Sequence, residues 1–285
     1  MRFVAPTTWV DALDAKAEHP DAVPIAGGTD LMVGLNFGER PPAALLDLTR
    51  IAEITEWSRE DGVIHIGAGV AYSRIISELS RDAPGLAAAS RTVGSPQIRN
   101  RATVAGNLGT ASPAGDAHPP LLATGAVVHA ESVRGSRLIP IDEFFLGVKR
   151  NALAADELIR GVRVPAAPGP QHFAKVGTRN AMVIAVCSVA VALDPAARTV
   201  GTGIGSAAPT PRRSIEAERF AAAALPWTSG GPLDDDIALE FGSLVAAAAA
   251  PIDDVRGTEA YRRLALAVLA RRALAWAWAD LGGSR

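Results

Sequence analysis

The chain has 285 residues, of which 48% are hydrophobic and 20% are charged, and this globular composition excludes extensive disorder. A formal net charge of −2 excludes a basic field of the kind that binds nucleic acid or an anionic lipid surface. The single cysteine excludes an internal disulfide and a cysteine-ligated iron–sulfur cluster or zinc site within the chain.

The N-terminal residues contain no apolar stretch of signal-peptide length, and no window reaches about 18 uninterrupted apolar residues. We therefore expect a cytoplasmic protein without a membrane span. The arginine pairs at 212–213 and 262–263 lie among apolar residues of helical pattern, and we expect them on solvated helix faces.

Short strands and helices alternate in the first half of the chain. Residues 7–19 are predicted to be helical, because Trp9, Leu13 and Ala17 recur at helical spacing after a threonine cap. Further strands are predicted at 22–25, 45–48, 63–66, 126–130, 137–140 and 157–164, and helices at 31–35, 73–79 and 86–93. Residues 97–108 are predicted as a strand or turn that runs into an irregular glycine-rich loop.

A proline-rich segment, Pro165-Ala-Ala-Pro-Gly-Pro170, is the clearest linker in the sequence. We place a domain boundary there, with one domain at 1–165, divided into subdomains of about 1–58 and 59–165, and a second domain at 171–285. The second domain is predicted to contain strands at 172–177, 182–193 and 199–207, followed by helices at 214–224, 234–249 and 258–280. This order predicts an α+β fold with a small antiparallel sheet and packed helices.

Two glycine-rich stretches, Ala26-Gly-Gly-Thr-Asp-Leu31 and Thr103-Val-Ala-Gly-Asn-Leu108, point to a ligand. Glycine lets successive N–H groups line a concave anion site, because it has no Cβ to fill that space. The first stretch alone could be a tight strand-to-helix connection, and it matches neither a P-loop nor a G-x-G-x-x-G fingerprint. The second adds hydrogen-bonding side chains at Thr103, Asn107, Thr110 and Ser112. Together they predict a diphosphate held from two sides.

Other polar residues have more than one interpretation. Asp116 could cap the helix that begins near Pro119, or it could accept hydrogen bonds from ligand hydroxyls. Lys175 could reach solvent from its strand, or it could face the ligand if the second domain closes over it. His118 has no cysteine or second histidine at metal-ligand spacing, and Cys187 lies in an apolar run that favours core packing. We assign no metal site and no catalytic acid, base or nucleophile.

Both stretches, with Ser95 to Asp116 as a whole and Ile252-Asp-Asp-Val-Arg-Gly-Thr-Glu-Ala-Tyr-Arg-Arg263, resemble the FAD-binding medium subunit of the molybdenum hydroxylases. That family includes bacterial xanthine dehydrogenase, carbon monoxide dehydrogenase and nicotine dehydrogenase, and the resemblance covers essentially the whole chain. It implies an FAD-binding fold of the vanillyl-alcohol-oxidase type with two subdomains, plus a C-terminal α+β domain.

By position, the resemblance also implies cofactor-binding residues. The residues implied are Ile25, Ala26, Gly27, Gly28, Thr29, Asp30, Leu31, Thr103, Val104, Ala105, Gly106, Asn107, Thr110, Ser112, Asp116, Ile159 and Lys175. The two glycine-rich stretches would hold the FAD diphosphate through backbone amides, and Asp116 would contact FAD hydroxyls. Ala105 stands where the family usually has a second glycine, a change that keeps the backbone N–H. Gly109 stands where some relatives carry a cysteine.

The resemblance implies a heteromeric oxidoreductase, arranged as a dimer of heterotrimers. A large subunit would hold a molybdenum–pterin centre, and a small subunit would hold two 2Fe-2S clusters that pass electrons to the FAD of this chain. The external acceptor would be NAD⁺ or another electron acceptor such as oxygen or a quinone, and the substrate a purine such as xanthine or hypoxanthine. The alternative is a scaffold subunit of the same fold without flavin, or a module that binds another nucleotide.

Overall fold

The computed structural model describes residues 1–38, 40–228 and 231–283. The chain begins with a three-stranded parallel sheet in the order β1-β3-β2, formed by β1 (Arg2–Val4), β2 (Val23–Ile25) and β3 (Ala44–Asp47). Helix α1 (Trp9–Glu18) follows β1, and α2 (Leu31–Asn36) follows β2. Thr8 caps α1 by accepting from the amide of Asp11 at 3.2 Å, as the helical prediction for 7–19 requires.

A five-stranded antiparallel sheet forms the middle of the molecule, in the order β4-β5-β10-β6-β7. Its strands are β4 (Trp57–Glu60), β5 (Val63–Gly67), β6 (Val127–Ser132), β7 (Gly135–Pro140) and β10 (Leu158–Pro165). Alternate residues such as Ile64, Ile66 and Val128 are buried on one face, which the helices cover. Helix α6 (Val104–Thr110) packs on β10 and α8 (Ile141–Phe144) packs on β6 and β7, while α3 (Tyr72–Glu78), α4 (Pro84–Thr92), α5 (Pro96–Arg99) and α7 (His118–Ala123) complete the helical layer.

Smaller elements complete this part of the chain. A short 3₁₀ helix, η1 (Ala52–Ile54), precedes β4, and a two-stranded sheet pairs β8 (Phe145–Gly147) with β9 (Arg150–Asn151). One hydrophobic core runs through the parallel sheet, the five-stranded sheet and the helices, from Trp9 to Val164. The parallel sheet and the five-stranded sheet therefore share a core.

The C-terminal part is the predicted α+β unit. An antiparallel sheet in the order β11-β12-β13 consists of β11 (Gln171–Val176), β12 (Cys187–Asp194) and β13 (Thr199–Gly205). Helices α9 (Ile215–Ala224), α10 (Asp235–Ala248) and α11 (Glu259–Gly283) pack on it around a second core that runs from Cys187 to Leu281. Cys187 is fully buried, as expected for core packing.

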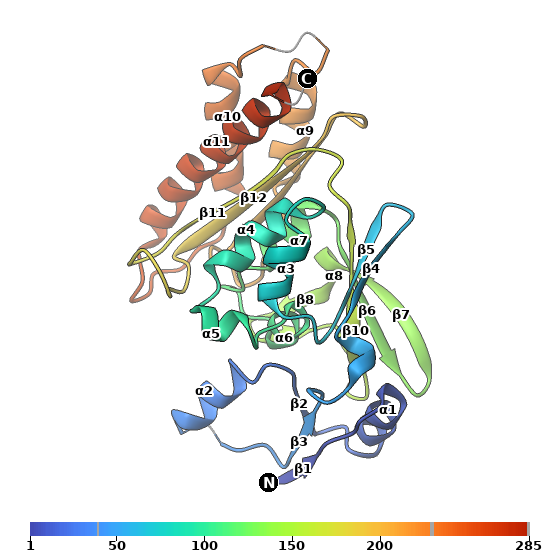
Figure 1. The fold of residues 1–285 in the computed structure, drawn as a ribbon. Helices are drawn as coiled ribbons and strands as arrows, with labels where there is room; N and C mark the ends of the chain where they lie inside the picture. The colour runs from blue at the N-terminus through green and yellow to red at the C-terminus, as the bar shows by residue number, and fades with distance from the viewer. Residues whose placement is uncertain (39, 229–230, 284–285) are drawn as a thin grey trace.

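The two parts meet where α7 lies across β13. A Cβ built on Gly201 or Gly203 would overlap the carbonyl oxygens of Ala123 and Pro119, so the bare strand admits the helix backbone. Figure 1 shows the C-terminal helices and the parallel sheet at opposite ends of the molecule, with the α3–α7 layer between them. The chain termini lie at these two ends (Figure 1).

The structure differs from several sequence predictions. Residues 97–108 form no strand: α5 ends at Arg99, a turn follows, and α6 begins at Val104. Arg262 is not on a solvated face: it is 4% exposed and donates to the carbonyl oxygen of Val186 at 3.0 Å. Strands β1, β4, β8 and β9 were not predicted.

Candidate functional site

The two glycine-rich stretches lie at one cleft of about 280 Å³. The first stretch is the turn between β2 and α2, and the second is the N-terminal half of α6. The hydroxyl of Thr110 donates to a carboxylate oxygen of Asp30 at 3.2 Å, which ties α6 to the first stretch across 80 residues of sequence. Twelve of the residues implied by the resemblance line the cleft: Ile25, Ala26, Gly27, Gly28, Thr29, Asp30, Leu31, Thr103, Gly106, Asn107, Thr110 and Ser112.

The glycines of the first stretch are needed by the protein itself. A Cβ on Gly27 would overlap the carbonyl group of Arg101, so the turn packs directly on the backbone that leads into α6. Gly28 has φ +72°, a left-handed conformation that favours glycine. At Gly106 a Cβ would lie 3.2 Å from the hydroxyl oxygen of Thr103 and 4.0 Å from Cβ of Ala26. A larger side chain at 106 would therefore fill the space between the two stretches.

Backbone amides supply the donors of the cleft. Within the described ranges, no N–H group of residues 26–30 donates a hydrogen bond to the protein. Thr103 caps α6 by accepting from the amide of Gly106 at 2.9 Å, and the amides of Val104 and Ala105 likewise have no acceptor among the described residues. The side chains of Val104 and Ala105 are buried in the core, at 1% and 7% exposure. These two residues can reach a ligand only through their N–H groups.

Two buried polar atoms at the cleft have no protein partner in the described part of the chain. They are the hydroxyl oxygen of Tyr72 and the amide oxygen Oδ1 of Asn107. Burial also raises the pKa of Tyr72, so its hydroxyl stays protonated. Buried polar groups in proteins are nearly always paired, so these two atoms are suited to a ligand that carries donors and acceptors.

Asp116 and Lys175 form an ion pair beside the cleft. The Lys175 ammonium lies 2.7 Å from Oδ2 of Asp116, and the two side chains are 10% and 11% exposed. Asp116 does not cap α7, whose N-cap residue is Ala117 and has no side-chain cap. Burial raises the pKa of Asp116, and the positive charge of Lys175 opposes that shift. The second carboxylate oxygen of Asp116 is buried and without a partner among the described residues.

Five of the implied residues do not line the cleft: Val104, Ala105, Asp116, Ile159 and Lys175. Ile159 is 7% exposed on β10, among the core residues. Conversely, the sequence analysis missed Tyr72 on α3 and Ile184, which reaches the cleft from the segment between β11 and β12. Gly115 also lines the cleft, and a Cβ there would overlap the ring of His118.

His118 supports the cleft from behind. It is fully buried, and Nε2 of its ring lies 3.2 Å from the carbonyl oxygen of Asn107. Burial lowers the pKa of His118 to about 4, so the imidazole is neutral near neutral pH. Among the described residues, no group of three or more potential ligands could hold a metal ion.

Comparisons with known proteins identify what kind of cleft this is. Residues 1–167 match the family model described as FAD binding domain in molybdopterin dehydrogenase, and residues 172–277 match CO dehydrogenase flavoprotein C-terminal domain. The chain belongs to this flavoprotein family. It is 30% identical over 286 residues to the putative xanthine dehydrogenase FAD-binding subunit XdhB of Escherichia coli (strain K12), which covers 97% of this chain and 95% of that protein.

Other relatives of this flavoprotein act on different substrates. The present chain is 36% identical over 205 residues to the nicotinate dehydrogenase FAD-subunit of Eubacterium barkeri. The match covers 68% of this chain and 69% of the Eubacterium barkeri protein. A solved structure of carbon monoxide dehydrogenase from Hydrogenophaga pseudoflava matches with a TM-score of 0.89 and 28% identity, covering 99% of this chain and 98% of that chain.

Family membership makes this chain an oxidoreductase subunit with FAD as its cofactor, as the resemblance implied. The cleft fits that group, because its unpaired amides are donors suited to a diphosphate and its buried oxygens can meet polar groups. None of the described helices is long and apolar enough to cross a lipid bilayer.

Proposed function

We propose that this chain holds FAD with its diphosphate between the two glycine-rich stretches and relays electrons within a molybdenum hydroxylase. The observation that carries the proposal is the pairing of the two stretches at one cleft, with amide donors that the described protein leaves unused. Amides of residues 25–31 and 103–107 would bind the diphosphate. Thr110 and Ser112 would lie near the flavin or the phosphates.

The remaining implied residues would act at the edge of the cofactor. The unpaired oxygen of Asp116 would accept from FAD hydroxyls, while Lys175 keeps that carboxylate oriented through its 2.7 Å ion pair. Ile159 and Lys175 would flank the cofactor. The bound FAD supplies redox chemistry that joins one-electron iron–sulfur centres to a two-electron acceptor. No side chain is assigned as a catalytic acid or base.

We propose a complex with two partner chains. A small subunit would carry 2Fe-2S clusters, and a large one the molybdenum–pterin centre, in a dimer of heterotrimers that reduces NAD⁺. The match to a carbon monoxide dehydrogenase chain, over 98% of that chain, supports the presence of partner chains. A cytoplasmic location and the domain division at 1–165 and 171–285 stay predictions.

For the substrate we propose a purine such as xanthine or hypoxanthine. Its support is the 30% identity to the xanthine dehydrogenase subunit of Escherichia coli over nearly the full length of both chains. The co-purified complex should bleach its flavin absorbance on addition of xanthine without NAD⁺. Bleaching by nicotinate and not by xanthine would contradict the purine assignment.

The flavin assignment is tested on the purified chain with a matched pair of variants. The wild-type chain should show the two flavin absorption bands and release FAD on denaturation, and FAD should raise its melting temperature more than ATP or NAD does. Gly106→Val should lose the flavin, because the new side chain fills the space between Thr103 and Ala26. Gly109→Val lies on the same helix, where a Cβ meets nothing within 4 Å, and should retain it. Equal flavin content in both variants would show that the second stretch is misassigned.

A further inference from the structure

A second groove lies on the face of the five-stranded sheet that the covering helices leave open. Its volume is about 340 Å³, and it shares no lining residue with the flavin cleft. Gly67 of β5 and Gly161 of β10 are paired across the sheet and both line the groove. A Cβ on Gly67 would overlap the carbonyl oxygen of Ile54, and one on Gly161 would overlap that of Ile66, so both glycines let backbone pack closely at the floor of the groove.

Two arginines of β10 line the groove. A bulge in the pairing of β10 with β6, between Ile159 and Gly161, brings Arg160 to the same face as Arg163. Nη1 of Arg160 and Nε of Arg163 are buried and have no hydrogen-bond partner within the described residues. The Arg160 guanidinium stacks on the Trp9 ring, 5.0 Å from the ring centre. Buried guanidinium donors without an acceptor are costly, so the groove favours a ligand that accepts hydrogen bonds.

Two histidines lie beside the arginines. His65 of β5 is the cross-strand partner of Arg163, and His129 of β6 is the partner of Gly161. Burial lowers the pKa of His129, and the positive charge of Arg163 lowers it further, while Glu131 acts in the opposite sense.

Two arginines and two histidines therefore gather at the groove, which Glu53 and Glu56 also line. Backbone hydrogen bonds lower the pKa of Glu53, and the positive charge of Arg160 lowers it further.

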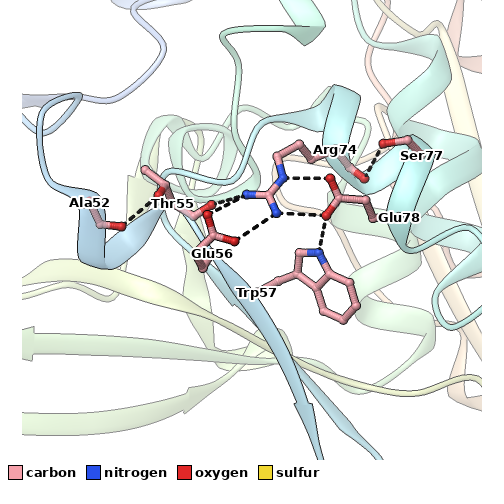
Figure 2. A network of polar contacts seen from close by, with 7 residues as sticks. All are labelled: Ala52, Thr55, Glu56, Trp57, Arg74, Ser77 and Glu78. Carbon is pink, nitrogen blue, oxygen red and sulfur yellow. Dashed lines mark hydrogen bonds and ion pairs between the residues drawn. The ribbon is translucent and has the colours of Figure 1, made fainter.

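The acidic residues at the rim are already engaged. Figure 2 shows the guanidinium of Arg74 between the carboxylates of Glu56 and Glu78, at 3.0 and 2.9 Å. The indole N–H of Trp57 donates to Glu78 at 2.6 Å, so the same network holds this wall of the groove in place (Figure 2). Glu53 accepts from a backbone amide at 3.1 Å and is the other carboxylate that lines the groove.

We propose that this groove binds a small oxyanion, a phosphate or carboxylate group carried by a diffusible molecule, through Arg160 and Arg163. Guanidinium groups match the planar, paired oxygens of these anions and form charge-assisted hydrogen bonds with them. The volume is at the lower end of the range of small-molecule pockets, about 300–1,000 Å³. Phosphate and carboxylate ligands share this chemistry, and the two probes below separate them.

The test is calorimetric titration of the flavin-loaded chain with inorganic diphosphate and, separately, with citrate at constant ionic strength. Flavin loading is required because diphosphate could also enter an empty flavin cleft. We expect saturable binding of at least one probe, and the tighter one identifies the ligand class. Arg160→Gln and Arg163→Gln should each weaken it at least about tenfold. Arg219→Gln, which removes an exposed arginine of α9, should leave it unchanged.

A second readout uses the wild-type chain alone, so it does not depend on whether an arginine variant folds. In the wild-type chain, a bound oxyanion should raise the pKa of His129, measured by histidine NMR, because it offsets the positive charge of Arg163. Arg163→Lys keeps the charge but loses the paired donors, so it should bind with intermediate affinity. The absence of saturable binding, an unchanged affinity in both glutamine variants, or an equal loss in Arg219→Gln would overturn the proposal.

Discussion

At the scale of single residues, burial decides the charge of the groups behind the flavin cleft. His118 is fully buried and its pKa falls to about 4, so the folded chain holds a neutral imidazole where the unfolded chain holds one with an ordinary pKa of 6.5. Asp116 shifts in the opposite sense, because burial raises its pKa despite the Lys175 ammonium. The ring of His118 contacts the carbonyl oxygen of Asn107. Because the ring is neutral, it places no positive charge in the core.

His118 should make the fold sensitive to acid. Its folded pKa is the lower one, so its contribution is complete above pH 6.5 and is lost as the pH falls to about 4. A shift of this size corresponds to about 3 kcal/mol of unfolding free energy. The wild-type chain should lose about that much more stability across this window than His118→Gln, measured by urea unfolding. Comparison at matched pH cancels the opposite contribution of Asp116. Parallel pH profiles in both proteins would contradict this account.

At the scale of elements, the glycines of β13 set how closely α7 approaches the C-terminal sheet. Gly203→Ala places a Cβ on the carbonyl oxygen of Pro119, which belongs to a helix turn that cannot yield locally. We expect a loss of about 2 kcal/mol or more in the free energy of unfolding. Gly147→Ala in β8 is the control, because its Cβ would lie 3.9 Å from Arg150, and it should change stability by less than about 0.5 kcal/mol. Equal effects would show that α7 does not rest on β13 as described.

The sequence predicted elements with strong periodicity and missed those stabilised by context. The strand at 63–66 and the three C-terminal helices were confirmed, because apolar alternation and helical spacing are visible locally. Helix α6 was missed because Gly106, Asn107 and Gly109 are poor helix formers; the Thr103 cap and the buried Val104 offset that weakness. Strand β4 was missed because three of its four residues are exposed at a sheet edge.

The same limit applies to the candidate site. The glycine-rich stretches were visible because their composition is unusual, and the structure brings both to one cleft. Tyr72 and Ile184 are common residue types that arrive from α3 and from the β11–β12 segment, so only the fold places them there. The ion pair between Asp116 and Lys175 joins residues 59 positions apart, and no local pattern predicts it.

At the scale of the whole molecule, the flavin cleft is built by parts of the chain that are far apart in the sequence. The β2–α2 turn, helix α6 and the segment between β11 and β12 each contribute lining residues. The Lys175–Asp116 ion pair and the bond from the Gly85 amide to Gln171, at 3.2 Å, link the C-terminal part to the layer around the cleft. A cofactor in this cleft should therefore stabilise the relative position of both parts.

The most direct test of the diphosphate site is how Gly106→Val changes the preference of the deflavinated chain for FAD over riboflavin, which lacks the diphosphate and the adenosine. Two charge-assisted amide bonds to the diphosphate, at about 1.5 kcal/mol or more each, predict that FAD binds at least about 100-fold tighter. Gly106→Val should remove most of that preference, and Gly109→Val should keep it. Riboflavin binding within about threefold of FAD, or a preference unchanged in Gly106→Val, would contradict the assignment of the two stretches to the diphosphate.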